Sequence, residues 1–167
     1  MAKYTGIIEL DRTLTQLKLA QSRDEHDEVM GELSDIAPQH IEALDELYDS
    51  NIYYRMPLIW SLLGQTSTLA IELFSKAIND KDQYTRWAAA SGLSGVRTRG
   101  ASSLLVAALK DRSHLVKGVA VDAMLKFRDP AAVPQLKKII ESEYLKKNAP
   151  GIVSSARKAL RVCNNAR

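Results

Sequence analysis

The sequence predicts an all-α protein, a right-handed α-solenoid (an α–α superhelix) of about four to five stacked helix pairs with an N-terminal capping helix. Glycine and proline, which interrupt helices, account for only 8 and 5 of the 167 residues. Apolar residues recur at helical spacing in many short segments. The pattern returns every 31 residues, as expected for a chain that stacks one helical unit repeatedly.

The 31-residue period links positions of similar character along the middle of the chain. The recurrent sets are one acidic, one basic and several apolar: Asp49, Asp80 and Asp111; Arg55, Arg86 and Lys117; Ile59, Ala90 and Val121; Leu62, Leu93 and Met124; Phe74, Leu105 and Leu136; Ala77, Ala108 and Ile139. Because so many positions share one spacing, we interpret the period as a structural repeat.

Each repeat is predicted to hold two helices. In the unit at residues 81–111, residues 84–93 have the apolar spacing of a first helix and residues 104–109 that of a second. The segment 95–100 between them has a glycine at each end, which suits a helix end and a turn. In the next unit a first helix is expected over 116–127. Asp129, followed by Pro130, is a candidate N-cap for the second helix.

We expect a single domain over residues 1–167. Residues 51–143 hold three clear repeats and residues 24–50 a degenerate one. Residues 1–22 form an N-terminal cap that includes a helix over 7–20. Residues 144–167 form a C-terminal cap, in which an irregular spacer at 146–151 precedes a helix over 152–162. Weak terminal repeats suit capping, because the outer face of a solenoid must be polar.

The paired helices, with an Asp after the second helix and an Arg or Lys six residues later, resemble HEAT-like repeats. The short period is similar to that of the phycobilisome-lyase type, since typical HEAT units have about 40 residues or more. The resemblance covers residues 55–160 well and residues 24–50 poorly. It implies the functions found among such families: protein-binding scaffolds, chromophore-handling proteins, accessory domains and some nucleic-acid-binding enzymes.

Bulk properties predict a cytoplasmic protein that does not contact membranes. The formal net charge of +3 permits an acidic partner without requiring nucleic acid. Cys163 is the single cysteine, so an internal disulfide is impossible and a reducing compartment is expected. The N-terminus has no secretory signal pattern. No segment approaches the roughly 18 apolar residues of a membrane span.

Catalytic chemistry finds little support in the sequence. The histidines, His26, His40 and His114, do not have the short spacing of metal ligands. Cys163 has no His or acidic residue close to it in sequence that would activate the thiol. There is no glycine-rich phosphate loop and no nucleophile motif. We therefore expect no enzymatic activity, no metal and no cofactor.

The recurrent acidic and basic residues lie six positions apart, where one unit meets the next. They could form a charged binding groove, or a chain of ion pairs that holds the units at their stacking angle. We favour the structural interpretation. A basic residue at the start of a first helix can reach the carboxylate of its own junction or of the next one. Arginine suits this task better than lysine because its planar guanidinium donates two hydrogen bonds at once.

Basic residues also occur in equivalent turns of two consecutive units. Arg97 and Arg99 lie in one turn, and Lys126 and Arg128 lie in the next. Stacking is expected to place them on one rim of the solenoid, and three further basic residues extend that side: Arg157, Lys158 and Arg161. The rim is either a contact surface for carboxylates or phosphates or an ordinary solvated edge.

Aromatic residues gather in the middle third of the chain. Five are candidate anchors for a partner: Tyr53, Tyr54, Trp60, Tyr84 and Trp87. The two tryptophans occupy positions that vary between repeats, and Tyr and Trp are the residues favoured at interface hot spots. Packing between helices is the alternative, and it is the interpretation that we assign to Phe74.

Charge is also unevenly distributed along the chain. Residues 24–49 are strongly acidic, whereas the C-terminal half is strongly basic. The acidic segment could bind a partner that has a basic patch. We favour the alternative that both are solvated faces.

A non-catalytic protein-binding scaffold is the function that these patterns favour. It would sequester, inhibit or assemble a partner protein through its second helices or its rim of turns, and an immunity-type inhibitor of a toxin belongs to this group. Two alternatives stay open. One is a nucleic-acid-binding helical-repeat protein that uses the basic rim. The other is an accessory protein that handles a small ligand or chromophore. The sequence identifies neither the partner nor the oligomeric state.

Overall fold

The computed structural model describes residues 5–166, and within them the chain forms helices and turns with no strand. The α-helices, in chain order, are α1 (Ile8–Leu19), α2 (Arg23–Ile36), α3 (Ile41–Ser50), α4 (Arg55–Ser61), α5 (Thr68–Ala77), α6 (Gln83–Gly95), α7 (Arg99–Ala108), α8 (His114–Phe127), α9 (Val133–Glu141), α10 (Glu143–Asn148) and α11 (Pro150–Asn164). Three short 3-10 turns, η1 (Ala37–Gln39), η2 (Ile52–Tyr54) and η3 (Pro130–Ala132), lie between them.

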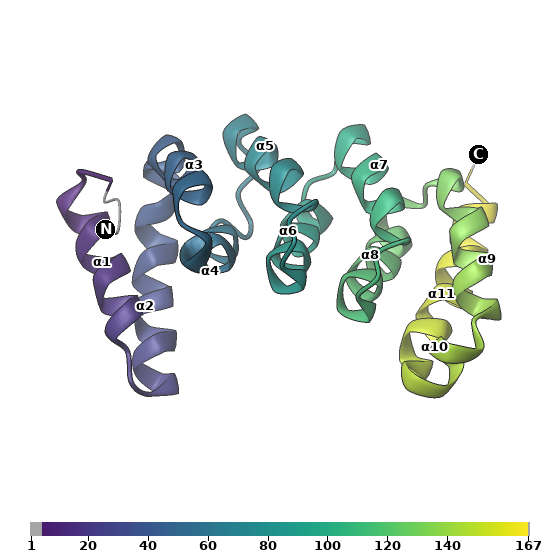
Figure 1. Ribbon diagram of the computed structural model, residues 1–167. Coiled ribbons are helices and arrows are strands. Elements are labelled where there is room, and N and C mark those ends of the chain that lie inside the picture. Colours follow the sequence, from purple (N-terminus) through teal and green to yellow (C-terminus); the bar gives the residue numbers. More distant parts are fainter. Residues whose placement is uncertain (1–4, 167) are drawn as a thin grey trace.

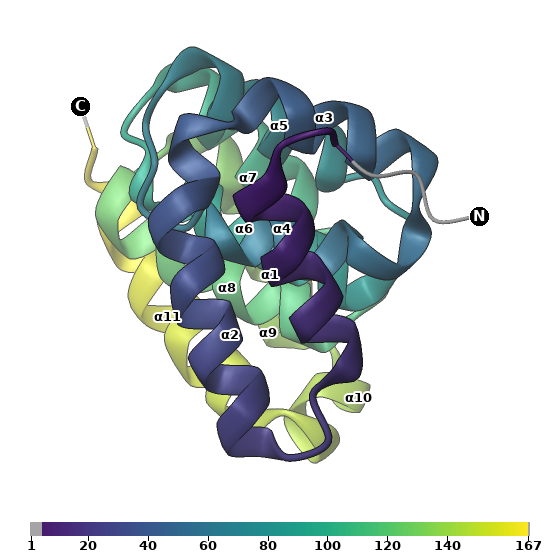
Figure 2. The ribbon, with the colours of Figure 1, turned by 90° about the vertical axis from the view of Figure 1, so that its left-hand side faces the viewer.

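The helices stack along one direction from the N-terminal to the C-terminal end (Figure 1). One layer contains α2, α4, α6, α8 and α11, and each of these helices packs against the next. A second layer contains α3, α5 and α7, which lie together when the molecule is viewed from its N-terminal end (Figure 2). Helix α1 covers α2 at one end of the stack, and α9 packs on α11 at the other. The predicted all-α solenoid is thus confirmed.

Helix N-caps recur with the period of the sequence. Three N-caps lie 31 residues apart, at Ser67, Thr98 and Asp129. The side chain of each accepts a hydrogen bond from a backbone amide at the start of the following helix or 3-10 turn. Such caps satisfy amides that have no partner within the helix, each contributing about 1 kcal/mol. The predicted cap at Asp129, with Pro130 in first position, is confirmed.

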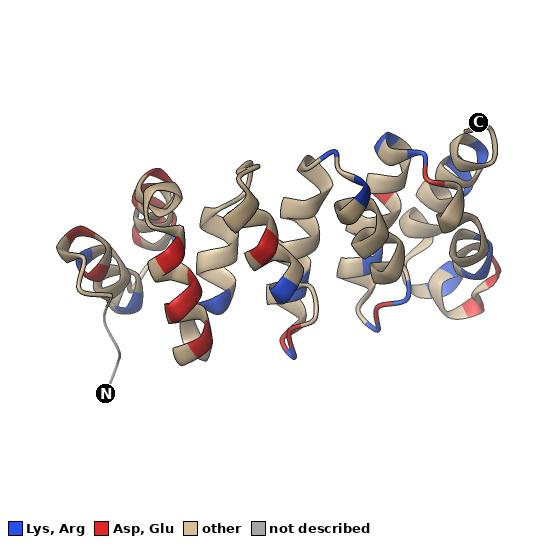
Figure 3. Cartoon of the chain, turned by 90° about the horizontal axis from the view of Figure 1, so that it is seen from above, with Lys and Arg blue, Asp and Glu red and all other residues tan. Residues whose placement is uncertain are grey.

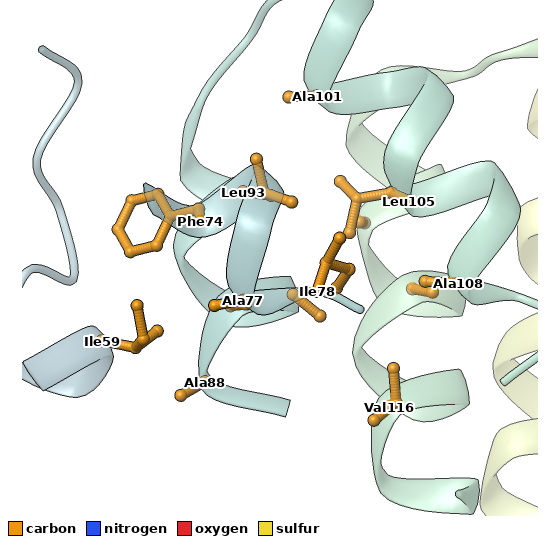
Figure 4. Close-up of a cluster of buried hydrophobic side chains, with 14 of the residues drawn as sticks. Ile59, Phe74, Ala77, Ile78, Ala88, Leu93, Ala101, Leu105, Ala108 and Val116 are labelled. Carbon is orange, nitrogen blue, oxygen red and sulfur yellow. The ribbon is translucent and has the colours of Figure 1, made fainter. Parts of the chain in front are cut away.

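The buried apolar residues form one core cluster, which contains the repeated apolar positions, and Figure 4 shows a part of it. Phe74, Leu93 and Leu105 are fully buried, as the sequence repeat predicts. Gly92 marks a close approach, because a Cβ atom there would lie 2.6 Å from the ring of Phe74. One unit later the equivalent residues are Leu105 and Ala123. The larger Phe74 thus occurs with a glycine, and the smaller Leu105 occurs with an alanine.

Two local expectations were wrong. Residues 146–151, expected as an irregular spacer, are helical except for Ala149: residues 146–148 end α10, which begins after the cap supplied by Ser142, and Pro150 begins α11. Gly100 lies inside α7 and not in the turn, since Thr98 caps that helix two residues earlier. No helix among the described residues is both long and apolar enough to cross a membrane.

Candidate functional site

Arg86 joins two consecutive units at the centre of the stack. Its side chain is almost completely buried, and its Nε and Nη2 donate to the two carboxylate oxygens of Asp111 at 2.7 and 3.0 Å. Its Nη1 donates to the carbonyl oxygens of Asp80 and Lys81, both at 2.9 Å. The guanidinium therefore caps the end of one unit while it pairs with the carboxylate at the end of the next.

Arg55 makes a related link one unit earlier. Its Nη1 donates to Asp80 at 3.1 Å, its Nε donates to the carbonyl of Tyr48 at 2.9 Å, and the Tyr48 hydroxyl donates to the same Asp80 carboxylate at 2.6 Å. Asp49 does not pair with Arg55 and instead accepts from Lys76 at 2.7 Å. Of the two junctions that an arginine could reach, both arginines select the next one, 25 residues along the chain.

These contacts shift the pKa values of the groups involved. Burial alone would raise the pKa of Asp111, but the hydrogen bonds from Arg86 and from the Ser113 amide outweigh it and hold that pKa below its usual value. The pKa of Asp80 is also lowered, because Tyr48, the Asp82 amide and Arg55 outweigh its burial. We call these recurrent links between consecutive units, Arg55 with Asp80 and Arg86 with Asp111, the ladder. Because its polar groups are directed at one another, the ladder serves stacking and leaves few polar groups free to bind a partner.

The rim of the solenoid holds a groove of about 510 Å³ between the α6–α7 and α8–α9 turns. Four basic residues that the sequence singled out, Arg97, Arg99, Lys126 and Arg128, line it, and we call it the basic groove. Arg128 follows α8 in the left-handed conformation, with φ of 54°, and its amide donates to the carbonyl of Met124. The four cations come from two consecutive units, so the stacking of the units brings them together.

The basic side chains of this groove have no acidic partner among residues 5–166. All four are exposed, and no ion pair joins any of them to a described carboxylate. Asp129 also lines the groove, but it accepts hydrogen bonds from the Ser102 hydroxyl at 2.6 Å and from the Ala131 amide at 2.9 Å. The groove therefore presents a local excess of positive charge to whatever lies against it.

A second groove, of about 470 Å³, crosses α2, α4 and α6. The rings of Trp60 and Trp87 lie with their centroids 4.7 Å apart and their planes tilted by 31°. Met30 and Met56 flank the two rings, and these four half-buried residues define what we call the tryptophan groove. An adjoining hollow of about 440 Å³, which includes the exposed Tyr53, shares His26 and Met56 with it.

The five aromatic candidates therefore have different positions. Trp60 and Trp87 line the tryptophan groove, and Tyr53 lines the hollow beside it. Tyr84 is exposed at the start of α6. The expectation that Tyr54 is a surface anchor is wrong, because the residue is only 4% exposed and belongs to the core. Its hydroxyl donates there to the carbonyl of Leu14 at 3.3 Å. Tyr54 is thus unavailable as a surface anchor.

Residues of α2 contribute to the tryptophan groove although the sequence pattern did not single them out for it. His26, Asp27 and Met30 line it from a helix that belongs to the degenerate N-terminal repeat. The only available signal was the helical spacing of residues 26, 27, 30 and 34 on one face of α2. That face carries mixed residue types, so the pattern does not distinguish a groove wall from an ordinary solvated face.

The nucleophilic and metal-ligating residues do not form a cluster in the described part of the chain. Cys163 is fully buried, its Sγ lies 3.7 Å from the carbonyl of Met124, and burial raises the pKa of its thiol. Across residues 5–166, no group of three or more His, Cys, Asp or Glu side chains is placed to hold a metal ion.

Charge is separated along the length of the molecule. Acidic residues are concentrated at the N-terminal end and basic residues toward the C-terminal end (Figure 3). In the sequence, residues 1–50 contain 12 acidic and 4 basic residues, and residues 51–167 contain 8 acidic and 19 basic residues. The tryptophan groove lies beside the acidic end and the basic groove lies in the basic half, so the two surfaces suit different chemical groups.

The stacked helix pairs define an α-solenoid. Two overlapping stretches, residues 37–124 and 70–160, match the family of HEAT repeats, and the chain belongs to this family. HEAT repeats are typical protein-interaction scaffolds. No curated protein matches the chain as a relative.

Proposed function

We propose that this protein is a non-catalytic scaffold that binds the acidic surface of a partner protein through the basic groove. The observation that carries the proposal is the set of four exposed cations around one groove, with no described carboxylate paired to any of them. Four uncompensated positive charges at one concave site favour a partner whose carboxylates replace the solvent around them.

The geometry favours side-chain carboxylates presented by a folded or extended protein segment. Three of the four cations are the arginines Arg97, Arg99 and Arg128, whose guanidinium groups can bind carboxylates in bidentate fashion. Phe127 and Pro130 add apolar surface to the same groove. An acidic segment that also carries an apolar residue therefore fits the groove better than a uniformly charged chain.

A nucleic acid is the competing occupant, because phosphates suit the same cations. The acidic N-terminal end counts against it, since its carboxylates would repel a polyanion that extended along the solenoid. The two occupants differ in a measurable way. Binding to phosphates weakens steeply and linearly on a logarithmic salt scale, and it is removed by nuclease treatment.

The test compares two variants of equal charge change. The first, Arg97→Glu, Arg99→Glu and Lys126→Glu, reverses the basic groove and leaves the left-handed Arg128 in place. The second, Lys137→Glu, Lys138→Glu and Lys147→Glu, reverses exposed lysines of α9 and α10 that do not line the groove. Partners captured from the source cell are identified by mass spectrometry, produced separately, and titrated calorimetrically against wild type and both variants.

We expect a single partner to bind wild type and the lysine variant with similar affinity, and the groove variant at least about 100-fold more weakly, since several charged contacts are each worth about 1 kcal/mol or more. Equal loss in both variants would instead indicate a response to overall charge. Recovery of nucleic acid that is released by nuclease, with no protein partner, would replace the proposal by the nucleic-acid function.

We further propose that the chain sequesters, inhibits or assembles its partner, and an immunity-type inhibitor of a toxin is one such role. The activity of the purified partner distinguishes an inhibitor from an assembly scaffold. An inhibitor abolishes that activity at an equimolar ratio, and the groove variant restores it. A scaffold that only assembles its partner leaves the activity intact.

A further inference from the structure

Four of the residues that line the tryptophan groove are large and apolar. The rings of Trp60 and Trp87 pack against each other, and the flexible side chains of Met30 and Met56 line the same groove. All four residues are half-buried, and all four line the groove. Tyr53, 58% exposed, continues the apolar surface in the adjoining hollow. Methionine adapts its shape easily, which suits a surface that receives another side chain.

The charged residues that line this groove favour an occupant with a positive charge. No lysine or arginine lines either the groove or the adjoining hollow, and the carboxylates that do are Asp27 and Asp82. Asp82 is engaged in capping α6 at Thr85, whereas Asp27 is 65% exposed. Its contacts with Arg23 and His26 are both 3.7 Å long and lie in solvent, where such pairs contribute little.

Aromatic faces attract cations, and tryptophan does so most strongly. We propose that the tryptophan groove binds an arginine- or lysine-bearing segment of a partner protein, with the cation over the Trp60 and Trp87 rings and beside Asp27, and with apolar neighbours on Met30 and Met56. The inference rests on the proposed function in taking the occupant to be part of a protein. It concerns a separate surface, which prefers a cationic segment, whereas the basic groove prefers an acidic one.

Intrinsic fluorescence reports this site directly, because Trp60 and Trp87 are the two tryptophans of the chain. The probe is a blocked peptide of about twelve residues that alternates leucine and arginine. The control peptide has citrulline in place of every arginine, which keeps the planar shape and three of the five N–H donors but removes the charge. We expect the arginine peptide to change the tryptophan emission and to saturate, and the citrulline peptide to bind at least about tenfold more weakly.

Two variants test the groove itself. Trp87→Leu keeps an apolar side chain but removes the ring, and we expect it to weaken binding of the arginine peptide by about tenfold. Asp27→Lys reverses an exposed charge on α2, and we expect a loss of about fivefold. Glu46→Lys, an equal change at an exposed site on α3, is the matched control and retains wild-type affinity. Circular dichroism melts verify that each variant is folded.

Several outcomes would overturn the inference. They are equal binding of the two peptides, equal losses in Asp27→Lys and Glu46→Lys, and no binding by a folded wild-type protein at millimolar peptide. A rise in mass with protein concentration alone, accompanied by the emission change, would assign the groove to a second copy of the chain instead. A variant with Arg97, Arg99 and Lys126 changed to Ala, which places no carboxylates in the basic groove, should bind the peptide as wild type does, so the two grooves succeed or fail separately.

Discussion

Two neighbouring repeat units, residues 81–111 and 112–142, each contain a pair of helices, α6 with α7 and α8 with α9. They differ at the junction that follows each pair. Arg86 of the first is buried and donates two hydrogen bonds to Asp111 across the junction, while its Nη1 donates to the carbonyls of Asp80 and Lys81, where its own unit begins. Lys117 is the corresponding residue of the second, and the position of the carboxylate one unit later is occupied by Ser142. Ser142 caps the short helix α10 instead of receiving a basic side chain.

The difference shows what the ladder is for. A carboxylate as little exposed as that of Asp111, at 12%, is tolerated because a guanidinium and an amide satisfy it. At the end of the regular stack the chain turns into α10 and then α11, which packs against both α8 and α9. The ladder is therefore present where one regular unit follows another, and a helix cap replaces it where that succession ends.

The largest expected effect comes from removing the guanidinium of the central junction. Arg86→Ala removes the main partner of the Asp111 carboxylate and the donor to the carbonyls of Asp80 and Lys81. Because these acceptors are then unsatisfied, we expect a loss of about 3 to 5 kcal/mol in the free energy of unfolding. Lys117→Ala, at the equivalent position, should change it by less than about 0.5 kcal/mol. Chemical denaturation of both variants measures the contrast, and similar losses would show that the two junctions do not differ in energy.

Acid provides a second, intermediate effect. The pKa of Asp111 is lowered in the folded protein, so its contribution to stability is present above its unfolded value and is lost as the pH falls through the folded value. Asp111→Asn should therefore be less stable than wild type at pH 6, and should lose less of its remaining stability between pH 5 and pH 2.5.

The measurement is the denaturation midpoint at several pH values within that range. Asp122→Asn, which removes an exposed carboxylate of α8 that makes no ion pair within residues 5–166, is the matched substitution. If both variants show the same pH dependence, the acid response does not arise at the junction.

The smallest expected effect is a gain. Lys117→Arg combined with Ser142→Asp would copy the central junction onto the terminal one, while aspartate can still cap α10. We expect a gain of about 1 kcal/mol over the sum of the two single variants, measured by a double-mutant cycle. A coupling of zero or of the opposite sign would mean that the turn into α10 holds the two positions too far apart.

The sequence determined the fold because the fold is periodic. A 31-residue spacing of apolar, acidic and basic positions identifies helix pairs and their stacking without any long-range information, and the buried Phe74, Leu93 and Leu105 follow from it. It also placed Arg97, Arg99, Lys126 and Arg128 on one rim, since equivalent turns of stacked units must lie side by side.

Tertiary structure alone decided the contacts that break the period. Trp60 meets Trp87, 27 residues later, on a groove completed by α2, and Tyr54 turns into the core while Tyr53 next to it faces solvent. Arg86 bypasses the carboxylate six residues before it and pairs with the one 25 residues after it. The physical reason is that a repeat specifies which faces are buried, whereas the rotation of one unit on the next specifies which side chains meet across them.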